Sequence, residues 1–486
     1  MSNENVEIPE LGLLGLARFA WRQLTSMRTA LILLMMLGLG AIPGSVIPQR
    51  TSNPIAVRDF FEKHPGTASI YDKLSLFDVY GSPWFSAIYI LLFISLIGCV
   101  LPRTVEHFHA MRAQPPATPR NLNRMEHHTT FAADLSALES AEKWFRTNRF
   151  RIRREGNSIS AEKGYLRETG NLLFHLSLIL ILVGVSLGSL FGMQGEAIVN
   201  TNERFVNVPT SYDSLRLGKL TSDKDLAPFT ITVDKFVAKY DPKTSMPQDY
   251  TAYVTTTDNG VTKKQIIKVN SPLTFGSTRV YLQANGYSPI VTVRDSLGNV
   301  SFQGPVPFLP QDGNLRSIGA IKVPDATPQV GFVASFVPTY ERTKTMGAVS
   351  IYPELLKPRL LFSVWGGDLG LDSGVPQSVY RIDTAKMQNL GLGSIGIGET
   401  FNYKGGTITL EGVVPWVNLQ FVDDRGKGFA LLGGVCAVLG LLASLYGRRR
   451  RIWVRITGSQ VEVAGLAKNN APGLEEEIAQ LVESVK

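Results

Sequence analysis

One histidine inside a long apolar stretch is the residue whose type and surroundings most clearly indicate chemistry. Between Asn171 and Gly192, His175 is the only ionisable side chain, and about 20 apolar residues suffice for a helix to cross a bilayer. Ionisable groups in lipid are costly and usually face a partner, a ligand or a cavity. His175 is therefore either a packing residue that hydrogen-bonds a neighbouring helix or an axial ligand of a haem iron held at the membrane.

Other candidate groups carry weaker signals. The segment after the second apolar stretch contains four histidines in pairs that can bind metal: His107, His109, His127 and His128. No cysteine accompanies them and their neighbours are rich in arginine, so we expect a solvated surface. Both cysteines, Cys99 and Cys436, lie in apolar stretches, which leaves no C-x-x-C pair for thiol chemistry. We assign no catalytic residue.

The elements that must position His175 are membrane helices. We predict transmembrane helices at residues 30–47, 84–101, 171–191 and 428–447 of this 486-residue chain. Lysine and arginine concentrate before the first helix, between the second and third, and directly after the fourth at 448–451. The positive-inside rule then places both termini in the cytoplasm. The net charge of +8 follows from these loops at the lipid bilayer and implies no nucleic-acid partner.

This topology divides the rest of the chain between the two sides of the membrane. We expect an amphipathic cytoplasmic segment at 1–29, an extracytoplasmic loop at 48–83, a cytoplasmic segment at 102–170, an extracytoplasmic β-rich domain at 192–427 and a cytoplasmic tail at 448–486. A strand–helix–strand pattern between 131 and 161 predicts a small α+β unit. The tail is either an interaction element or a solvated appendage.

The large segment at 192–427 alternates apolar and polar residues in short runs, such as 229–233, 279–283 and 290–293. Turn signals separate the runs, among them residues 258–260 and Asn285-Gly286. This segment contains no histidine, which disfavours a hydrolase triad or a zinc site. The expected fold is an α-helical membrane protein with four transmembrane helices plus a β-rich, sandwich-like extracytoplasmic domain.

Several local motifs in combination resemble one family. They are SMRTALILL (26–34), IPGSVIPQR (42–50), LSLFDVYGSPWF (74–85), LIGCVLPR (96–103), Gly170-Asn171 with His175, NSP (270–272), YLQ (281–283), LQFV (419–422) and RRRRIWVRI (448–456). Over almost the whole chain the sequence resembles the ResB/CcsB-type proteins of system II cytochrome c biogenesis. It departs from the family at DDRG (423–426), where a Pro-Gly step is more usual, so the geometry of the turn into the last helix is open.

The resemblance implies a haem-handling subunit beside a CcsA/ResC-type multi-spanning membrane protein that bears a Trp-rich motif. Together they move haem across the plasma membrane and present it to apocytochrome c. The alternative is a structural scaffold that docks the partner haem ligase and apocytochrome without ligating haem. The chain is expected to have no independent activity, and to be a non-catalytic or co-catalytic subunit of a holocytochrome c synthase complex.

The resemblance also implies haem ligation by an intramembrane histidine, and His175 is the residue that matches as haem-binding and iron-ligating group. The haem is expected to be b-type in transit, with its second axial ligand from the partner because this chain has one intramembrane histidine. His175 lies about 5 Å below the cytoplasmic boundary. Asn171 and Glu168 share its helix face, where Asn171 is either an orienting partner or a polar interfacial cap.

Overall fold

The computed structural model describes residues 12–50, 52–343, 347–371, 379–446, 449–467 and 473–486. The chain forms two compact units, one of residues 1–185 with 427–486 and one of residues 186–426. Two predicted features lie partly outside the described residues, namely the start of the N-terminal segment and Arg448 of the basic run. Each unit has its own core and is described by itself.

Four helices among the described residues are long and apolar enough to cross a membrane, as predicted. They are α2 (Met27–Val46), α5 (Pro83–Arg112), α7 (Leu166–Phe191) and α8 (Lys427–Tyr446). The amphipathic helix expected before them is α1 (Leu13–Leu24). Side-chain caps begin two of the spans, because the Ser26 and Ser82 hydroxyls accept from backbone N–H groups in the first turns of α2 and α5. Helix α5 continues beyond its predicted end through Pro102.

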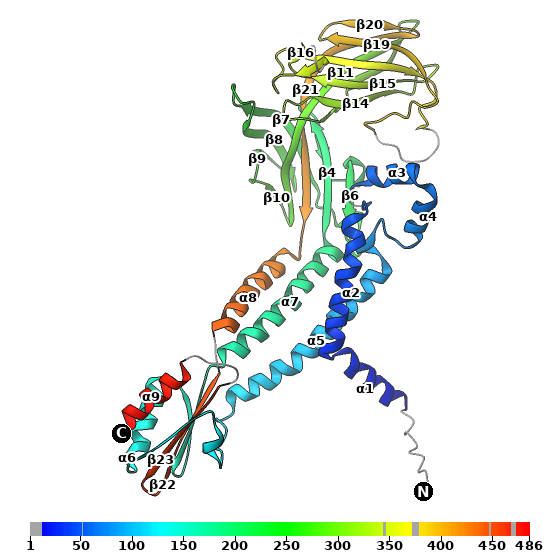
Figure 1. Ribbon diagram of the computed structural model, residues 1–486. Coiled ribbons are helices and arrows are strands. Elements are labelled where there is room, and N and C mark those ends of the chain that lie inside the picture. Colours follow the sequence, from blue (N-terminus) through cyan, green and yellow to red (C-terminus); the bar gives the residue numbers. More distant parts are fainter. Residues whose placement is uncertain (1–11, 51, 344–346, 372–378, 447–448, 468–472) are drawn as a thin grey trace, which may run out of the picture. The chain divides into compact units, whose positions relative to one another are not determined.

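The spanning helices lie in pairs, α2 beside α5 and α7 beside α8 (Figure 1). Glycines allow the second pair to approach closely. A Cβ added at Gly170 would lie 2.5 Å from the backbone nitrogen of Ser444, and one added at Gly440 would lie 2.6 Å from that of Phe174. Helices α3 (Pro54–Lys63) and α4 (Pro65–Lys73) follow α2 and pack Val57, Ala68 and Phe77 into a small cluster.

A small α/β subdomain of the first unit is built from two distant parts of the chain. Its elements are β1 (His127–Ala132), α6 (Ser136–Thr147), β2 (Arg151–Glu155), β3 (Ser158–Lys163), β22 (Arg450–Thr457), β23 (Gln460–Ala467) and α9 (Leu474–Val485). The sheet order is β1-β23-β22-β3-β2, and both helices bury apolar side chains against it. The C-terminal tail therefore completes the predicted α+β unit and is neither a separate interaction element nor a solvated appendage.

The second unit is β-rich, as predicted. Its strands are β4 (Met193–Asn200), β5 (Arg204–Val206), β6 (Ser214–Leu217), β7 (Phe229–Tyr240), β8 (Pro247–Asp258), β9 (Val261–Lys268), β10 (Leu273–Phe275), β11 (Thr278–Asp295), β12 (Val300–Pro305), β13 (Leu309–Pro310), β14 (Ser317–Val323), β15 (Val330–Val337), β16 (Tyr340–Thr343), β17 (Gly347–Ser350), β18 (Arg359–Gly366), β19 (Gln388–Gly396), β20 (Thr400–Tyr403) and β21 (Gly406–Asp423). One sheet, β10-β11-β21-β4-β6, contributes to two cores, which it shares with β5-β7-β8-β9 and with β13-β14-β15-β18-β19.

The turn expected at Asn285-Gly286 is wrong, because these residues lie inside β11. Strands β11 and β21 each run for 18 residues and connect the two cores (Figure 1). Glycine is needed at 286 for packing: a Cβ there would lie 2.4 Å from the Trp416 ring, which crosses the strand between the cores. The glycine at position 286 therefore reflects the close approach of the Trp416 ring to the strand, and not a turn.

The DDRG segment (423–426), whose geometry was left open by the sequence, forms a compact turn between β21 and α8. The Asp424 carboxylate accepts from the N–H of Gly426 at 3.0 Å. The Asp423 carboxylate accepts from the Ser277 hydroxyl at 2.8 Å. Side-chain acceptors thus hold this turn.

Candidate functional site

His175 lies in the third turn of α7, and its imidazole is half-buried. The ring nitrogen Nδ1 is buried without a hydrogen-bond partner in the described part of the chain. The other nitrogen, Nε2, likewise makes no hydrogen bond within the same residues. The Phe174 ring centroid lies 5.3 Å away. In the described part of the chain the imidazole is thus not bonded to a neighbouring helix, as a packing histidine would be.

A positive charge lies close to this imidazole. Arg103 of α5 exerts a direct electrostatic effect on His175. Its guanidinium lies 3.1 Å from the sulfur of Met27 in α2, and no described carboxylate forms an ion pair with it. Both residues fall in motifs that carry the family resemblance, 96–103 and 26–34.

The two residues that share the helix face of His175 form no hydrogen bond with it in the described part of the chain. Asn171 is exposed, and no hydrogen bond joins it to His175 among the described residues. Glu168 instead accepts from Nη1 of Arg449 at 3.1 and 3.2 Å. Because Nδ1 of His175 has no partner on its own helix, a group from outside the chain must satisfy it or it remains unpaired.

The expectation of a solvated surface is wrong for His107 of α5, and Nε2 of His128 in β1 is also buried, without a hydrogen-bond partner among the described residues. The His107 side chain is only 9% exposed, and its Nε2 lies 2.9 Å from the Thr169 hydroxyl of α7. Its Nδ1 lies 3.6 Å from the Glu168 carboxylate. Of the described residues, no three His, Cys, Asp or Glu side chains gather in a way that could hold a metal ion. His107 therefore joins helices α5 and α7.

A buried carboxylate next to α7 was not anticipated from sequence. Glu162 is 1% exposed and accepts from Nε of Arg449 at 2.5 Å, from Nε of Arg451 at 2.9 Å and from the Tyr165 hydroxyl at 2.5 Å. Burial alone would raise the pKa of Glu162, but the hydrogen bonds from Arg449, Tyr165 and Arg451 outweigh it and lower that pKa. The start of α7 is thereby tied to the α/β subdomain.

No sequence signal could have identified this network. Arg449 and Glu168 are separated by 281 positions, and the basic run after α8 is sufficiently explained by the positive-inside rule. Only the pairing of β22 with β3 brings the two guanidiniums to the carboxylate.

The site can supply one imidazole to a metal or a haem iron, and it cannot complete a coordination sphere by itself. An iron with two axial ligands would need its second from another chain. A bare metal ion would need three or four side-chain ligands, and the described residues hold no such group of His, Cys, Asp or Glu.

Comparison with known proteins places the chain in a family. The model of the ResB-like family matches residues 27–479. Proteins named cytochrome c biogenesis protein CcsB are similar over nearly the full length of both chains. The one from Synechococcus sp. (strain JA-3-3Ab) is 26% identical over 95% of this chain and 88% of its own, and the one from Prochlorococcus marinus (strain NATL1A) is 24% identical over 94% and 96%. A third, from Crocosphaera subtropica, is 23% identical over 99% of this chain and 97% of its own. With this match across its helices and its β-rich unit alike, the chain belongs to the ResB-like family.

Proposed function

We propose that this protein acts in cytochrome c maturation as a haem-handling subunit in the plasma membrane, with His175 as one axial ligand of the haem iron. The names of its CcsB relatives support the pathway. The single observation that carries the ligand role is the imidazole of His175, which lies in an apolar helix with its buried Nδ1 unpaired among the described residues. A neutral imidazole ligates iron without carrying a charge into lipid.

The second ligand and the path of the haem belong to a partner. With one imidazole available, the haem site lies at an interface, and a CcsA/ResC-type multi-spanning protein supplies the opposite bond. Bound haem supplies an iron centre and two carboxylates, and Arg103 provides a cation beside His175 for one of them. The haem is a b-type haem in transit.

The orientation of the chain in the membrane follows from the distribution of lysine and arginine. Both termini and the α/β subdomain lie in the cytoplasm, and the β-rich unit lies outside, where apocytochrome c receives haem. Reporter fusions after Gly66, Pro119 and Gly298 should report outside, inside and outside. A fusion after Lys468, which lies outside the described residues, should report inside. A cytoplasmic signal from the Gly298 fusion would overturn this orientation.

The test of the ligand role is the absorption spectrum of the purified complex with the partner. His175→Ala should remove most of the haem absorption, and added imidazole should restore it, because the free base can occupy the vacated axial position. His109→Ala is the matched control, since His109 is an exposed histidine on the neighbouring helix α5. The control should keep the wild-type spectrum.

The second candidate function is a scaffold that docks the haem ligase and apocytochrome without touching the iron. The half-buried position of His175 and its edge-to-face contact with the Phe174 ring favour a packing role. If His175→Ala retains full haem and imidazole changes nothing, the ligand role fails and the scaffold function stands.

A further inference from the structure

Strand β11 has an open edge in the middle of the β-rich unit. On one side it pairs with β21 over its whole length. On the other side it pairs with β10 only up to Val280 and with β12 only from Ile290. The carbonyls of Tyr287 and Pro289 accept from N–H groups of the chain near β13. Over residues 281–286, no strand of the described part of the chain pairs with this edge, although β9 lies near β11.

A β-bulge lies within the open edge. Leu282 pairs with Leu419 and Ala284 with Asn418, so Gln283 is an extra residue without a partner on β21. Asn285 pairs with Val417, which faces the same side as Leu419. Asn285 therefore shares a face with Leu282, whereas strict alternation would have placed it with Tyr281. Because of the bulge, the side chains near Gln283, including the Asn285 carboxamide, do not follow the regular alternation between the two faces of β11.

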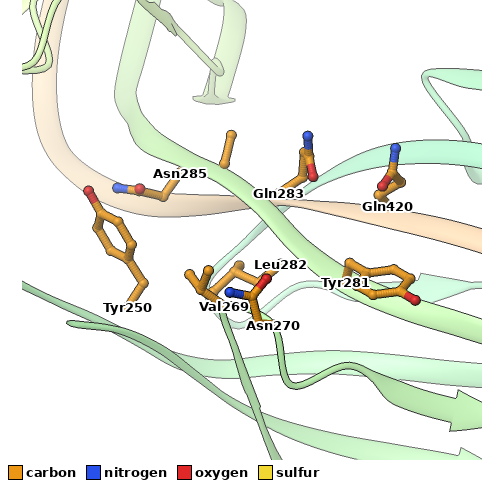
Figure 2. Close-up of a pocket in the computed structure, with 9 residues that line it drawn as sticks. Tyr250, Val269, Asn270, Tyr281, Leu282, Gln283, Asn285 and Gln420 are labelled. Atoms are coloured by element: carbon orange, nitrogen blue, oxygen red, sulfur yellow. The ribbon is translucent and has the colours of Figure 1, made fainter. Parts of the chain in front are cut away.

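These carboxamides line a pocket of about 370 Å³ (Figure 2). Asn270, Gln283, Asn285 and Gln420 line it together with two tyrosines, and no ionisable acid or base other than these phenols does so. In Figure 2 the Tyr250 hydroxyl points toward the Asn285 carboxamide. Among the described residues, no hydrogen bond engages the side chains of Asn270, Gln283 or Gln420. Their donors and acceptors remain available.

Three sequence motifs that have no part in the haem site contribute residues to the lining of this pocket. Segments 270–272, 281–283 and 419–422 are far apart in the chain and carry the family resemblance. Each contributes at least one lining residue. Asn270 adopts a left-handed backbone with φ of 62° between β9 and β10, a conformation that asparagine tolerates better than most residues. The three motifs therefore build one site.

We propose that this open edge and its pocket bind an extended segment of apocytochrome c through the main chain, as an added strand along β11. The inference rests on the proposed function, which brings an unfolded cytochrome polypeptide to this unit. An exposed strand edge offers backbone N–H and C=O groups to an extended chain. Asparagine and glutamine carboxamides offer the same donor and acceptor pair to peptide groups.

Main-chain recognition suits this polypeptide. Backbone hydrogen bonds are independent of side chains, so an added strand can be held whatever its sequence. An uncharged lining accepts acidic and basic segments alike. Exposed lysines on the neighbouring strand β9, such as Lys263 and Lys264, disfavour pairing there, so an added strand is directed to β11.

The test measures binding of short fluorescent peptides to the full-length protein in nanodiscs. One peptide contains a C-x-x-C-H segment with alkylated thiols, the second is its scrambled version, and the third is N-methylated at alternate residues. The first two should bind with similar affinity and the third at least about tenfold more weakly, because methylation removes the N–H donors of one edge.

The matched variants are Gln283→Met with Gln420→Met, and Gln303→Met as a control on exposed β12. The double variant should weaken peptide binding by about tenfold or more, and the control should not. In the complex with the partner, the double variant should keep the wild-type haem spectrum, which separates this claim from the role of His175. Its circular dichroism spectrum should match that of the wild type, which shows that the β-rich unit is folded. Equal binding of the N-methylated peptide, unchanged binding by the double variant, or competition by an oligosaccharide but not by peptide would each overturn the proposal.

Discussion

Replacing Glu162 by glutamine should loosen the junction between α7 and the α/β subdomain. The carboxylate is 1% exposed and holds two guanidiniums that are 20% and 32% exposed. A hydrogen bond to a charged group contributes about 1.5–3 kcal/mol and a neutral one about 0.5–1.5 kcal/mol. Because glutamine keeps the acceptor oxygen but loses the charge, each of the two Arg bonds should lose about 1–1.5 kcal/mol. The expected loss is therefore about 2–3 kcal/mol.

The assay is hydrogen exchange of the full-length protein in nanodiscs, read by mass spectrometry on β3 and β22. At neutral pH, Glu162→Gln should speed exchange there by roughly 30- to 150-fold, since about 1.4 kcal/mol is a factor of ten. The matched control is Glu155→Gln on β2, whose carboxylate is 47% exposed and pairs with Arg153 at the surface. Exposed pairs contribute about 0–1 kcal/mol, so the control should exchange nearly as the wild type does.

The same residue predicts a pH dependence. The pKa of Glu162 is lowered in the folded protein from its ordinary value of 4.5. Its stabilising contribution is therefore fully present above pH 4.5 and is lost as pH falls through the folded pKa. The exchange difference between wild type and Glu162→Gln should shrink as the solution is acidified below pH 4.5. Equal exchange of the two proteins at neutral pH, or an equal effect of Glu155→Gln, would refute the reasoning.

Three further predictions concern packing and charge. Gly286→Ala should lower the stability of the β-rich unit by about 1–3 kcal/mol in chemical denaturation, because its Cβ meets Trp416; Gly313→Ala, in open space, should not. Gly170→Leu should reduce disulfide cross-linking between cysteines placed on α7 and α8, and Gly434→Leu should leave it unchanged. Arg103→Gln should lower the haem reduction potential by on the order of 50 mV in a redox titration, because a nearby cation favours the reduced iron.

The helices and the general class of the second unit could be predicted because their signals are local. Runs of apolar residues set α2, α5, α7 and α8 wherever they occur in the chain. The alternation of apolar and polar residues likewise indicates strands. It does not show where a strand ends when a glycine is present for packing and not for a turn. The strands predicted at 279–283 and 290–293 are a single element, β11, because the Trp416 ring occupies the space beside Gly286.

The sequence by itself also singled out His175, because an ionisable side chain in an apolar run is conspicuous without any partner. Tertiary structure alone decided what surrounds it. The Arg103 guanidinium of α5 lies at the Met27 sulfur, no hydrogen bond joins Asn171 to His175 among the described residues, and Glu168 bonds Arg449 from the far end of the chain. The tail's place in the β1-β23-β22-β3-β2 sheet and the pocket on β11 arise in the same way. Composition and periodicity report the environment a residue needs, whereas strand pairing over hundreds of positions selects which side chains provide it.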